Sequence, residues 1–302
     1  MAILVVGSVA FDSVRTPSGY QDELLGGSAT YFSIAASYFA PVSLVAVVGE
    51  DFPEAHLDFL RLKGIDVSGL QRVEGRTFRW RGEYNLDMNS ARTLETELNV
   101  FADFRPRLRS EHRDIEFLFL GNIDPELQQV VLEQMRRPRV VACDTMNYWI
   151  ERKLDSLKRT LALVDILLIN DAETRQLAAE QNLVRAAQSI LRWGPKILVI
   201  KRGECGALLI SAKSIFAMPA MPLEQVVDPT GAGDSFAGGF MGYIASCKSL
   251  NESDLRKAVV FGSVMASFNV DEFGPARLGN LTFTEIRDRF HEFSKLMRFD
   301  DI

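Results

Sequence analysis

The segment from Asp228 to Gly239 combines glycines and a carboxylate in a spacing that suits phosphate chemistry. Pro229 ends the apolar run before it, and Gly231 and Gly233 allow the backbone to turn tightly and approach a ligand closely. Apolar side chains then recur every four residues, as in a helix with one face on a core: Phe236, Phe240 and Ile244. The glycines should therefore stand at a helix N-terminus, where unpaired N–H groups and the helix dipole favour an anion.

Asp234 follows these glycines directly. A carboxylate would repel a phosphate group, but it can take the proton from a hydroxyl that attacks the phosphate. The alternative is a structural role, in which Asp234 caps the N-terminus of a core helix. A Gly-x-Gly pattern alone would favour the cap, so the choice rests on the wider motif.

That motif resembles the second signature of the ribokinase-like (PfkB) family of sugar and nucleoside kinases, closely from Asp228 to Gly239. The resemblance implies that Asp234 is the catalytic base. It also implies ATP and Mg²⁺ as cofactors, and it leaves open a monovalent cation such as K⁺. The remaining roles in the loop follow from the same resemblance: Gly231, Ala232 and Gly233 form the anion hole for the transferred phosphoryl group, and Asp228 and Thr230 contact the nucleotide.

Two motifs near the N-terminus resemble the acceptor-binding parts of the same family. Gly7-Ser-Val-Ala-Phe-Asp12 implies that Asp12 binds sugar hydroxyls, although Asp12 could simply be a polar residue at a strand exit. Gly26 and Gly27 precede a helix in a stretch similar to the first signature, whose paired glycines meet the sugar. Tyr31 stands where the family usually has an Asn that contacts sugar hydroxyls. Tyr31 could stack on a base or another apolar ring, or it could only pack.

Asn170-Asp-Ala-Glu173 follows an apolar run and begins a helix. Its form is that of a capping box, in which the side chains of Asn170 and Glu173 bind each other's backbone amides. It also matches the family's Asn-x-x-Glu motif, which is tied to magnesium and phosphate through water. We therefore expect both roles, with magnesium held mostly by water near Asp228, Asn170 and Glu173.

The segment Lys201-Arg-Gly-Glu-Cys-Gly206 lies between two predicted strands, and its structural alternative is a hairpin turn. The resemblance places nucleotide phosphates here. Lys201 would bring positive charge to the triphosphate, with Gly203 at the point of close approach and Gly206 beside it. Ser263 and Ser267 resemble the wall of the adenine pocket, although ordinary helix packing explains such residues as well.

Short β-rich runs alternate with helix-period segments along the whole chain, which predicts an α/β fold with a mainly parallel sheet between two helical layers. The predicted strands are Ile3–Val6, Ser43–Val48, Phe117–Leu120, Arg139–Cys143, Ile166–Ile169, Ile197–Ile200 and Ala207–Ile210. The predicted helical segments include Pro125–Met135, Glu151–Leu163 and Glu173–Leu191. Ligands bind at the carboxyl ends of such strands, which adds Asn122 and Asp144 to the candidate acceptor-binding residues.

Residues 75–104 predict a β-hairpin, because polar and apolar side chains alternate on both sides of a polar turn. If it folds about Met88, Arg81 faces Glu95, Arg79 faces Glu97 and Phe78 faces Leu98. The family has a small β lid at this place, which covers the sugar and often forms a dimer contact. We therefore expect one ribokinase-like kinase domain over residues 1–302, with a lid formed mainly by about residues 75–104, and a homodimer contact through that lid.

Composition limits the partners. The net charge of −6 disfavours nucleic-acid binding, and no apolar stretch approaches the about 18 residues that a membrane span needs. No signal peptide is visible, and the three cysteines each lie in an apolar run. Buried thiols in a reducing cytoplasm are the expectation.

The resulting hypothesis is an ATP-dependent kinase that phosphorylates a hydroxymethyl group of a nucleoside or related sugar. Tyr31 and the aromatic lid residues Phe78, Trp80 and Tyr84 favour a nucleoside. A free sugar or cyclitol is the alternative acceptor, and a nucleotide-binding sensor without turnover is the alternative class. The glycine spacing of a dinucleotide-binding dehydrogenase is absent from the sequence.

Overall fold

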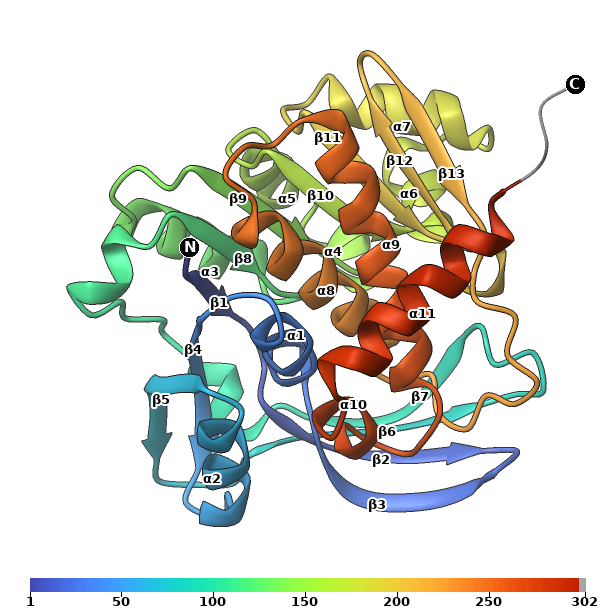
Figure 1. The fold of residues 1–302 in the computed structure, drawn as a ribbon. Coiled ribbons are helices and arrows are strands. Elements are labelled where there is room, and N and C mark those ends of the chain that lie inside the picture. Colours follow the sequence, from blue (N-terminus) through green and yellow to red (C-terminus); the bar gives the residue numbers. More distant parts are fainter. Residues whose placement is uncertain (299–302) are drawn as a thin grey trace, which may run out of the picture.

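The computed structural model describes residues 1–298 and has a nine-stranded sheet at its centre (Figure 1). The strand order is β13-β12-β11-β10-β9-β8-β1-β4-β5. The parallel strands are β1 (Ile3–Val6), β4 (Val42–Gly49), β5 (Ile65–Val73), β8 (Phe117–Leu120), β9 (Val140–Asp144), β10 (Ile166–Asn170) and β11 (Ile197–Lys201). At one edge, β12 (Ala207–Ser211) and β13 (Ile215–Met218) run antiparallel. The predicted parallel sheet is confirmed.

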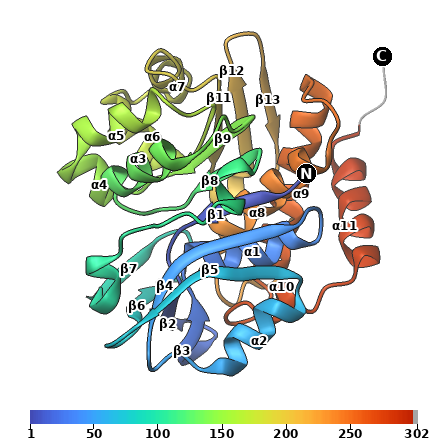
Figure 2. The same cartoon turned by 90° about the vertical axis from the view of Figure 1, so that its left-hand side faces the viewer.

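Helices cover both faces of this sheet, as predicted (Figure 2). Successive side chains of each buried strand point to opposite faces, so Val5 joins one core and Leu4 the other. The first core includes α1 (Ser28–Ser37), α2 (Glu54–Leu62), α8 (Ala232–Ser246), α9 (Glu252–Asn269), α10 (Ala276–Gly279) and α11 (Phe283–Leu296). The second includes α3 (Pro125–Gln134), α4 (Asn147–Arg152), α5 (Leu154–Leu161), α6 (Asp171–Ala178) and α7 (Leu183–Leu191).

Two of the predicted helical segments are each divided in two. The segment 151–163 is interrupted at Lys153, between α4 and α5. The segment 173–191 is interrupted at Ala179, whose backbone is left-handed with φ of 51° and ends α6. Asn182 then caps α7 by accepting a hydrogen bond from the Arg185 amide at 3.1 Å. Periodicity alone does not show such breaks, because the apolar face continues across them.

The lid is a second, four-stranded sheet with the order β3-β2-β6-β7. The predicted hairpin is present as β6 (Phe78–Tyr84) and β7 (Ala91–Glu97), and its register pairs Arg81 with Glu95 and Arg79 with Glu97, as predicted. The predicted Phe78–Leu98 pair falls outside this register, since β7 ends at Glu97. The other half of the lid was not predicted. It consists of β2 (Ala10–Thr16) and β3 (Gly19–Gly26), with β2 parallel to β6.

The connecting segments include three short 3-10 helices, η1 (Asn99–Asp103), η2 (Glu111–Asp114) and η3 (Gly203–Cys205). Turn η3 exposes Cys205, so the expectation of a buried thiol is wrong there, whereas Cys143 is buried and Cys247 half-buried. Within residues 1–298, no helix has both the length and the apolar character to cross a membrane.

Candidate active site

The glycine loop turns into helix α8, as the sequence predicts. Gly231 adopts a left-handed conformation with φ of 75° and is the N-cap of the helix, which begins at Ala232. The Ala232 amide already donates to the Pro229 carbonyl at 3.1 Å. The Gly233 amide, in the same first helical turn, is therefore the better donor for an anion.

The Tyr31 ring packs against this loop at Gly231. A Cβ atom at Gly231 would lie 2.4 Å from the Tyr31 ring, so only glycine fits above it. The Tyr31 side chain is 2% exposed. Burial raises its pKa well above the usual value, and the nearby Asp12 and Asp228 add to this shift. Of the two interpretations of Tyr31, the structure favours packing, because a buried ring leaves no face for a base.

Asp234 lies in the first turn of α8 and is half-buried. Burial and the neighbouring Asp144 raise its pKa to about 7, and Lys201 opposes this shift. Asp144 ends β9 and Lys201 ends β11, and their side chains form an ion pair of 2.7 Å. Only 5% of the Asp144 side chain and 16% of the Lys201 side chain are exposed. A Cβ atom at Gly233 would lie 3.1 Å from the Lys201 amino group, so this positive charge stands beside the anion-binding turn.

Asp12 faces the same region from the lid strand β2. Burial raises its pKa to about 7; the amide of Gly27, at 3.4 Å, opposes the shift, while Asp228 and Asp234 add to it. A Cβ atom at Gly26 would lie 2.1 Å from the Asp12 carboxylate, and one at Gly27 would lie 2.5 Å from the Ser8 carbonyl. Gly26 thus makes room for the Asp12 carboxylate, and Gly27 makes room for the turn into α1. These structural roles do not depend on a contact with a sugar.

Asp228 holds the glycine loop in place. Its carboxylate oxygens accept hydrogen bonds from the amides of Thr230, at 2.9 Å, and Gly274, at 3.2 Å. These two hydrogen bonds use about half of the lone-pair positions of the carboxylate and fix its orientation. Thr230 in turn contacts the lid, where its hydroxyl lies 3.4 Å from the Tyr84 hydroxyl.

The predicted capping box of α6 is present. The side-chain oxygen Oδ1 of Asn170 accepts from the backbone amide of Glu173 at 2.7 Å, and the backbone amide of Asn170 donates to the Glu173 carboxylate at 3.1 Å. Burial and Asp144 raise the pKa of Glu173 to about 7, against the effect of Lys201. Glu173 therefore shares the electrostatic environment of the Asp144–Lys201 pair, and its predicted second role with magnesium stays a prediction.

The described residues contain no group of three or more His, Cys, Asp or Glu side chains arranged to hold a metal ion. Magnesium commonly keeps several waters and binds through substrate phosphates and one or two carboxylates, so it does not require such a cluster. Glu173 and Asp228 each accept backbone hydrogen bonds and keep lone pairs for such a contact, so their assignment to magnesium stays a prediction.

A family model described as pfkB family carbohydrate kinase matches residues 3–280. The chain belongs to the pfkB family of carbohydrate kinases. Family membership makes it a kinase whose phosphoryl donor is ATP and which uses a divalent metal.

Relatives of this pfkB-family kinase include nucleoside kinases. A cytidine kinase of Thermococcus kodakarensis is 31% identical over 256 residues, which cover 83% of this chain and 91% of the relative. A nucleoside kinase of Methanothermobacter thermautotrophicus is 25% identical over 90% of each chain. Among solved structures, a Burkholderia thailandensis nucleoside kinase in complex with ADP-inosine has a TM-score of 0.80 at 19% identity, covering 96% of this chain and 95% of that one.

Other predicted site residues of this pfkB-family kinase have local structural roles. The Ser263 hydroxyl faces the Met218 sulfur at 3.6 Å, and the Ser267 hydroxyl donates to the Val264 carbonyl at 2.8 Å. Arg289 also donates to Ser267 at 3.0 Å. These contacts correspond to the helix-packing alternative, and the assignment of both serines to adenine stays a prediction.

The same holds for Asn122 and Gly206. The side-chain oxygen of Asn122 accepts a hydrogen bond from the Trp149 indole at 3.0 Å, so this oxygen has a structural partner within the protein. A Cβ atom at Gly206 would lie 2.1 Å from the Met218 carbonyl, so the close approach there is to β13.

Gly203 connects the lid with the predicted nucleotide turn. Its backbone is left-handed, with φ of 51°, and a Cβ atom there would lie 2.6 Å from the Asn89 side chain of the lid hairpin. Asn89 also donates to Glu204 at 3.3 Å. Sequence reasoning missed Asn89, and no pattern in the sequence relates residues so far apart.

We expect kcat/KM for the acceptor to decrease as the pH is lowered below about 7, because a protonated Asp234 cannot accept the hydroxyl proton. The decline should approach about tenfold per pH unit below the pKa, as for one essential base. Asp12 and Glu173 titrate in the same range, so the observed pKa belongs to the coupled group. The measurement is a pH profile of the parent beside Glu173→Gln. A profile that stays flat well below pH 7 would contradict the role of Asp234.

Proposed function

We propose that this kinase transfers the γ-phosphoryl group of ATP to a hydroxymethyl group of a nucleoside. The observation that carries the proposal is the half-buried Asp234 carboxyl, with its raised pKa, at the N-terminus of α8 beside the Asp144–Lys201 pair. A base with a pKa near 7 is ionised in enough molecules at neutral pH to accept a proton, yet basic enough to take it.

In this mechanism Asp12 binds acceptor hydroxyls from the lid side and orients the hydroxymethyl group. Asp234 takes the proton of this hydroxyl as its oxygen bonds to the γ-phosphorus, while the bond from the γ-phosphorus to the β-phosphate oxygen breaks and ADP leaves. The Gly233 amide and the Lys201 amino group stabilise the negative charge on the transferred group, since both are already at the glycine turn in the free enzyme. A bound Mg²⁺, held through Glu173 and water, would neutralise phosphate charge.

A nucleoside is favoured as acceptor by the named relatives and by the lid. Tyr31 no longer supports this choice, since its ring packs under Gly231. Phe78 stacks on Phe101 at 5.3 Å and so belongs to the lid's own packing. Trp80 remains: it pairs with Asp12 in the parallel β2–β6 register, which puts both side chains on one face of the lid. The Trp80 indole donates to the Thr93 hydroxyl at 3.1 Å and lies against the backbone at Gly82, where a Cβ atom would come within 2.3 Å of the ring.

If Trp80 is the platform for the base, Trp80→Ala should weaken nucleoside binding by roughly 1–3 kcal/mol, the range for base–aromatic stacking. A free sugar makes no such contact, so its KM should change little. KM values for a nucleoside and for ribose, measured on parent and variant, check this. Equal effects on both acceptors would assign Trp80 to lid stability instead.

The experiment that tests the function is a turnover screen with ATP and a panel of acceptors, followed by ADP release and identification of the phosphorylated product. Cytidine, inosine and adenosine represent nucleosides, and ribose, fructose and myo-inositol represent sugars and cyclitols. Turnover of the sugars or the cyclitol alone would select the alternative acceptor class. ATP binding without turnover of any acceptor would favour the sensor.

The homodimer through the lid stays a proposal. It is supported by the family resemblance. A stimulation of turnover by K⁺ and a cytoplasmic location likewise remain proposals.

A further inference from the structure

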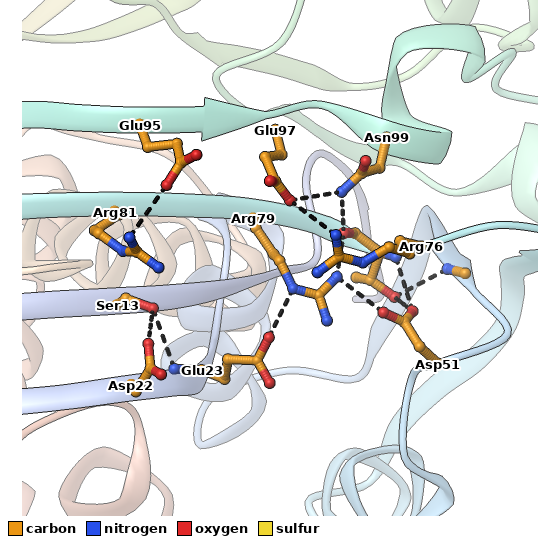
Figure 3. Close-up of polar contacts among 12 residues, drawn as sticks. Ser13, Asp22, Glu23, Asp51, Arg76, Arg79, Arg81, Glu95, Glu97 and Asn99 are labelled. Carbon is orange, nitrogen blue, oxygen red and sulfur yellow. Dashed lines mark hydrogen bonds and ion pairs between the residues drawn. The ribbon is translucent and has the colours of Figure 1, made fainter.

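Arg79 makes polar contacts with three residues on the face of the lid sheet that is opposite to Asp12 (Figure 3). Its guanidinium donates to Glu23 at 2.7 Å, and it forms an ion pair with Asp51 at 2.8 Å. It also donates to the Thr77 carbonyl at 3.0 Å and lies over the Phe11 ring, 5.0 Å from its centre. With 18% of its side chain exposed, Arg79 is largely withdrawn from solvent.

Asp51 belongs to the body of the protein, in the loop that follows β4. One of its carboxylate oxygens accepts from the Thr77 amide at 2.8 Å and from the Thr77 hydroxyl at 2.6 Å. The Thr77 hydroxyl in turn accepts from the Gly49 amide at 3.0 Å. Thr77 is fully buried at the point where the chain passes from β5 of the body to β6 of the lid. The Arg79–Asp51 pair thus spans the joint between the two sheets.

Glu23 lies on the other side of Arg79, within the lid. Its backbone is left-handed, with φ of 46°, and it stands at the register shift of the β2–β3 pair between Asp12 and Val14. Such a bulge changes the direction in which a neighbouring side chain points. The Glu23 amide also donates to Ser13 at 3.2 Å, which fastens this irregular place to β2. Asp12, the acceptor-binding candidate, is the residue beside the shift.

We propose that Arg79 is a positioning residue, which fixes the lid on the body through Asp51 and holds the Asp12 strand in place through Glu23. Arg79 itself points away from the acceptor, because its neighbour Trp80 shares the face of Asp12. The part of this proposal that concerns Asp12 rests on the proposed function.

Arginine is the residue type that this joint requires. The planar guanidinium has several donors in a fixed geometry, so it can serve two carboxylates and a carbonyl at once and still stack on an aromatic ring. A lysine at this position would offer a single flexible ammonium group. It would retain a positive charge between Glu23 and Asp51, but not both ion pairs and the stacking on Phe11 together.

Arg81 offers a matched control two residues along the same strand. It is on the same face as Arg79 and also pairs with a carboxylate, Glu95 at 3.2 Å. This pair stays within the lid, and about half of each side chain is exposed: 49% for Arg81 and 51% for Glu95. Loss of Arg81 therefore removes a similar charge without touching the joint.

The experiment compares Arg79→Met, Arg79→Lys and Arg81→Met with the parent in the full-length protein. Steady-state kinetics with an acceptor that the parent turns over should show that Arg79→Met raises the acceptor KM about tenfold or more, the scale of a misplaced substrate contact. The KM for ATP should rise less than the acceptor KM, since Arg79 itself contacts none of the predicted nucleotide-binding residues. Arg79→Lys should recover part of the loss, and Arg81→Met should resemble the parent.

An acceptor KM for Arg79→Met equal to that of Arg81→Met would overturn the proposal. So would a parallel rise of both KM values together with a lower melting temperature, which indicates general destabilisation. If Arg79→Met does not fold, Asp51→Asn and Glu23→Gln each weaken one arm of the contact and should raise the acceptor KM in the same direction. No effect from either would also overturn it.

Amide hydrogen exchange separates this inference from the proposed function. Even if the parent turns over no acceptor, the amides of β2 and β6 should exchange faster in Arg79→Met than in Arg81→Met, because the lid is no longer fixed on the body. Equal exchange in the two variants would refute the joint, whatever the activity of the enzyme.

Discussion

Replacing Asp234 by Asn is expected to lower turnover by about 10²–10⁴-fold, the usual contribution of a general base. The amide has nearly the same shape but cannot accept the hydroxyl proton. ATP affinity should be nearly unchanged, because the Gly233 amide and Lys201 remain in place. Stability should not fall, since the substitution removes a carboxyl whose ionised form is disfavoured by burial.

Single-turnover kinetics and calorimetric titration of ATP check the two halves of this expectation. Asp288→Asn is the control for the change of residue type, because Asp288 lies on α11 with 61% of its side chain exposed. Turnover of Asp234→Asn within tenfold of the parent would remove Asp234 from the role of base. A loss of ATP binding would point instead to a role in shaping the turn.

Replacing Lys201 by Met is expected to affect both stability and catalysis. It leaves Asp144 as a buried carboxylate without its partner, and breaking a buried ion pair in this way costs about 3–5 kcal/mol. It also removes the positive charge beside Gly233, where we place the transferred phosphoryl group. Turnover should therefore fall even under conditions in which the variant is folded.

Lys196→Met is the matched control, since Lys196 precedes the same strand β11 and pairs with Asp165 at 2.7 Å, with 78% of its side chain exposed. A surface pair of this kind contributes about 0–1 kcal/mol. Denaturant unfolding of the two variants measures the difference. Adding Asp144→Asn to Lys201→Met should restore part of the stability but not the turnover. Equal stability of the two lysine variants would show that the Asp144–Lys201 pair is not structurally important.

Local sequence determined most of the central strands and the glycine loop. Apolar runs produced six of the seven parallel strands within one residue of the predicted bounds, because a strand buried on both faces needs a continuous apolar run. The edge strand β5 is only partly buried and was not predicted. The turn at Gly231 and the capping box of Asn170 and Glu173 were readable for a similar reason. Each depends on residues three or four positions apart, whose geometry the chain itself imposes. The register of Arg81 with Glu95 follows in the same way from a single hairpin.

Tertiary structure decided how these pieces form a site. β2 and β3 complete the lid only because β2 finds β6, more than sixty residues away in the chain. Tyr31 lies under Gly231, and Lys201 meets Asp144 across the intervening strand β10, because the sheet order brings their ends together. The raised pKa values of Asp12, Glu173 and Asp234 have burial as their largest cause. Burial is the joint effect of several distant segments, so no local pattern contains it. The residue types that do the chemistry are therefore local information, whereas their partners, pKa values and accessibility are properties of the assembled fold.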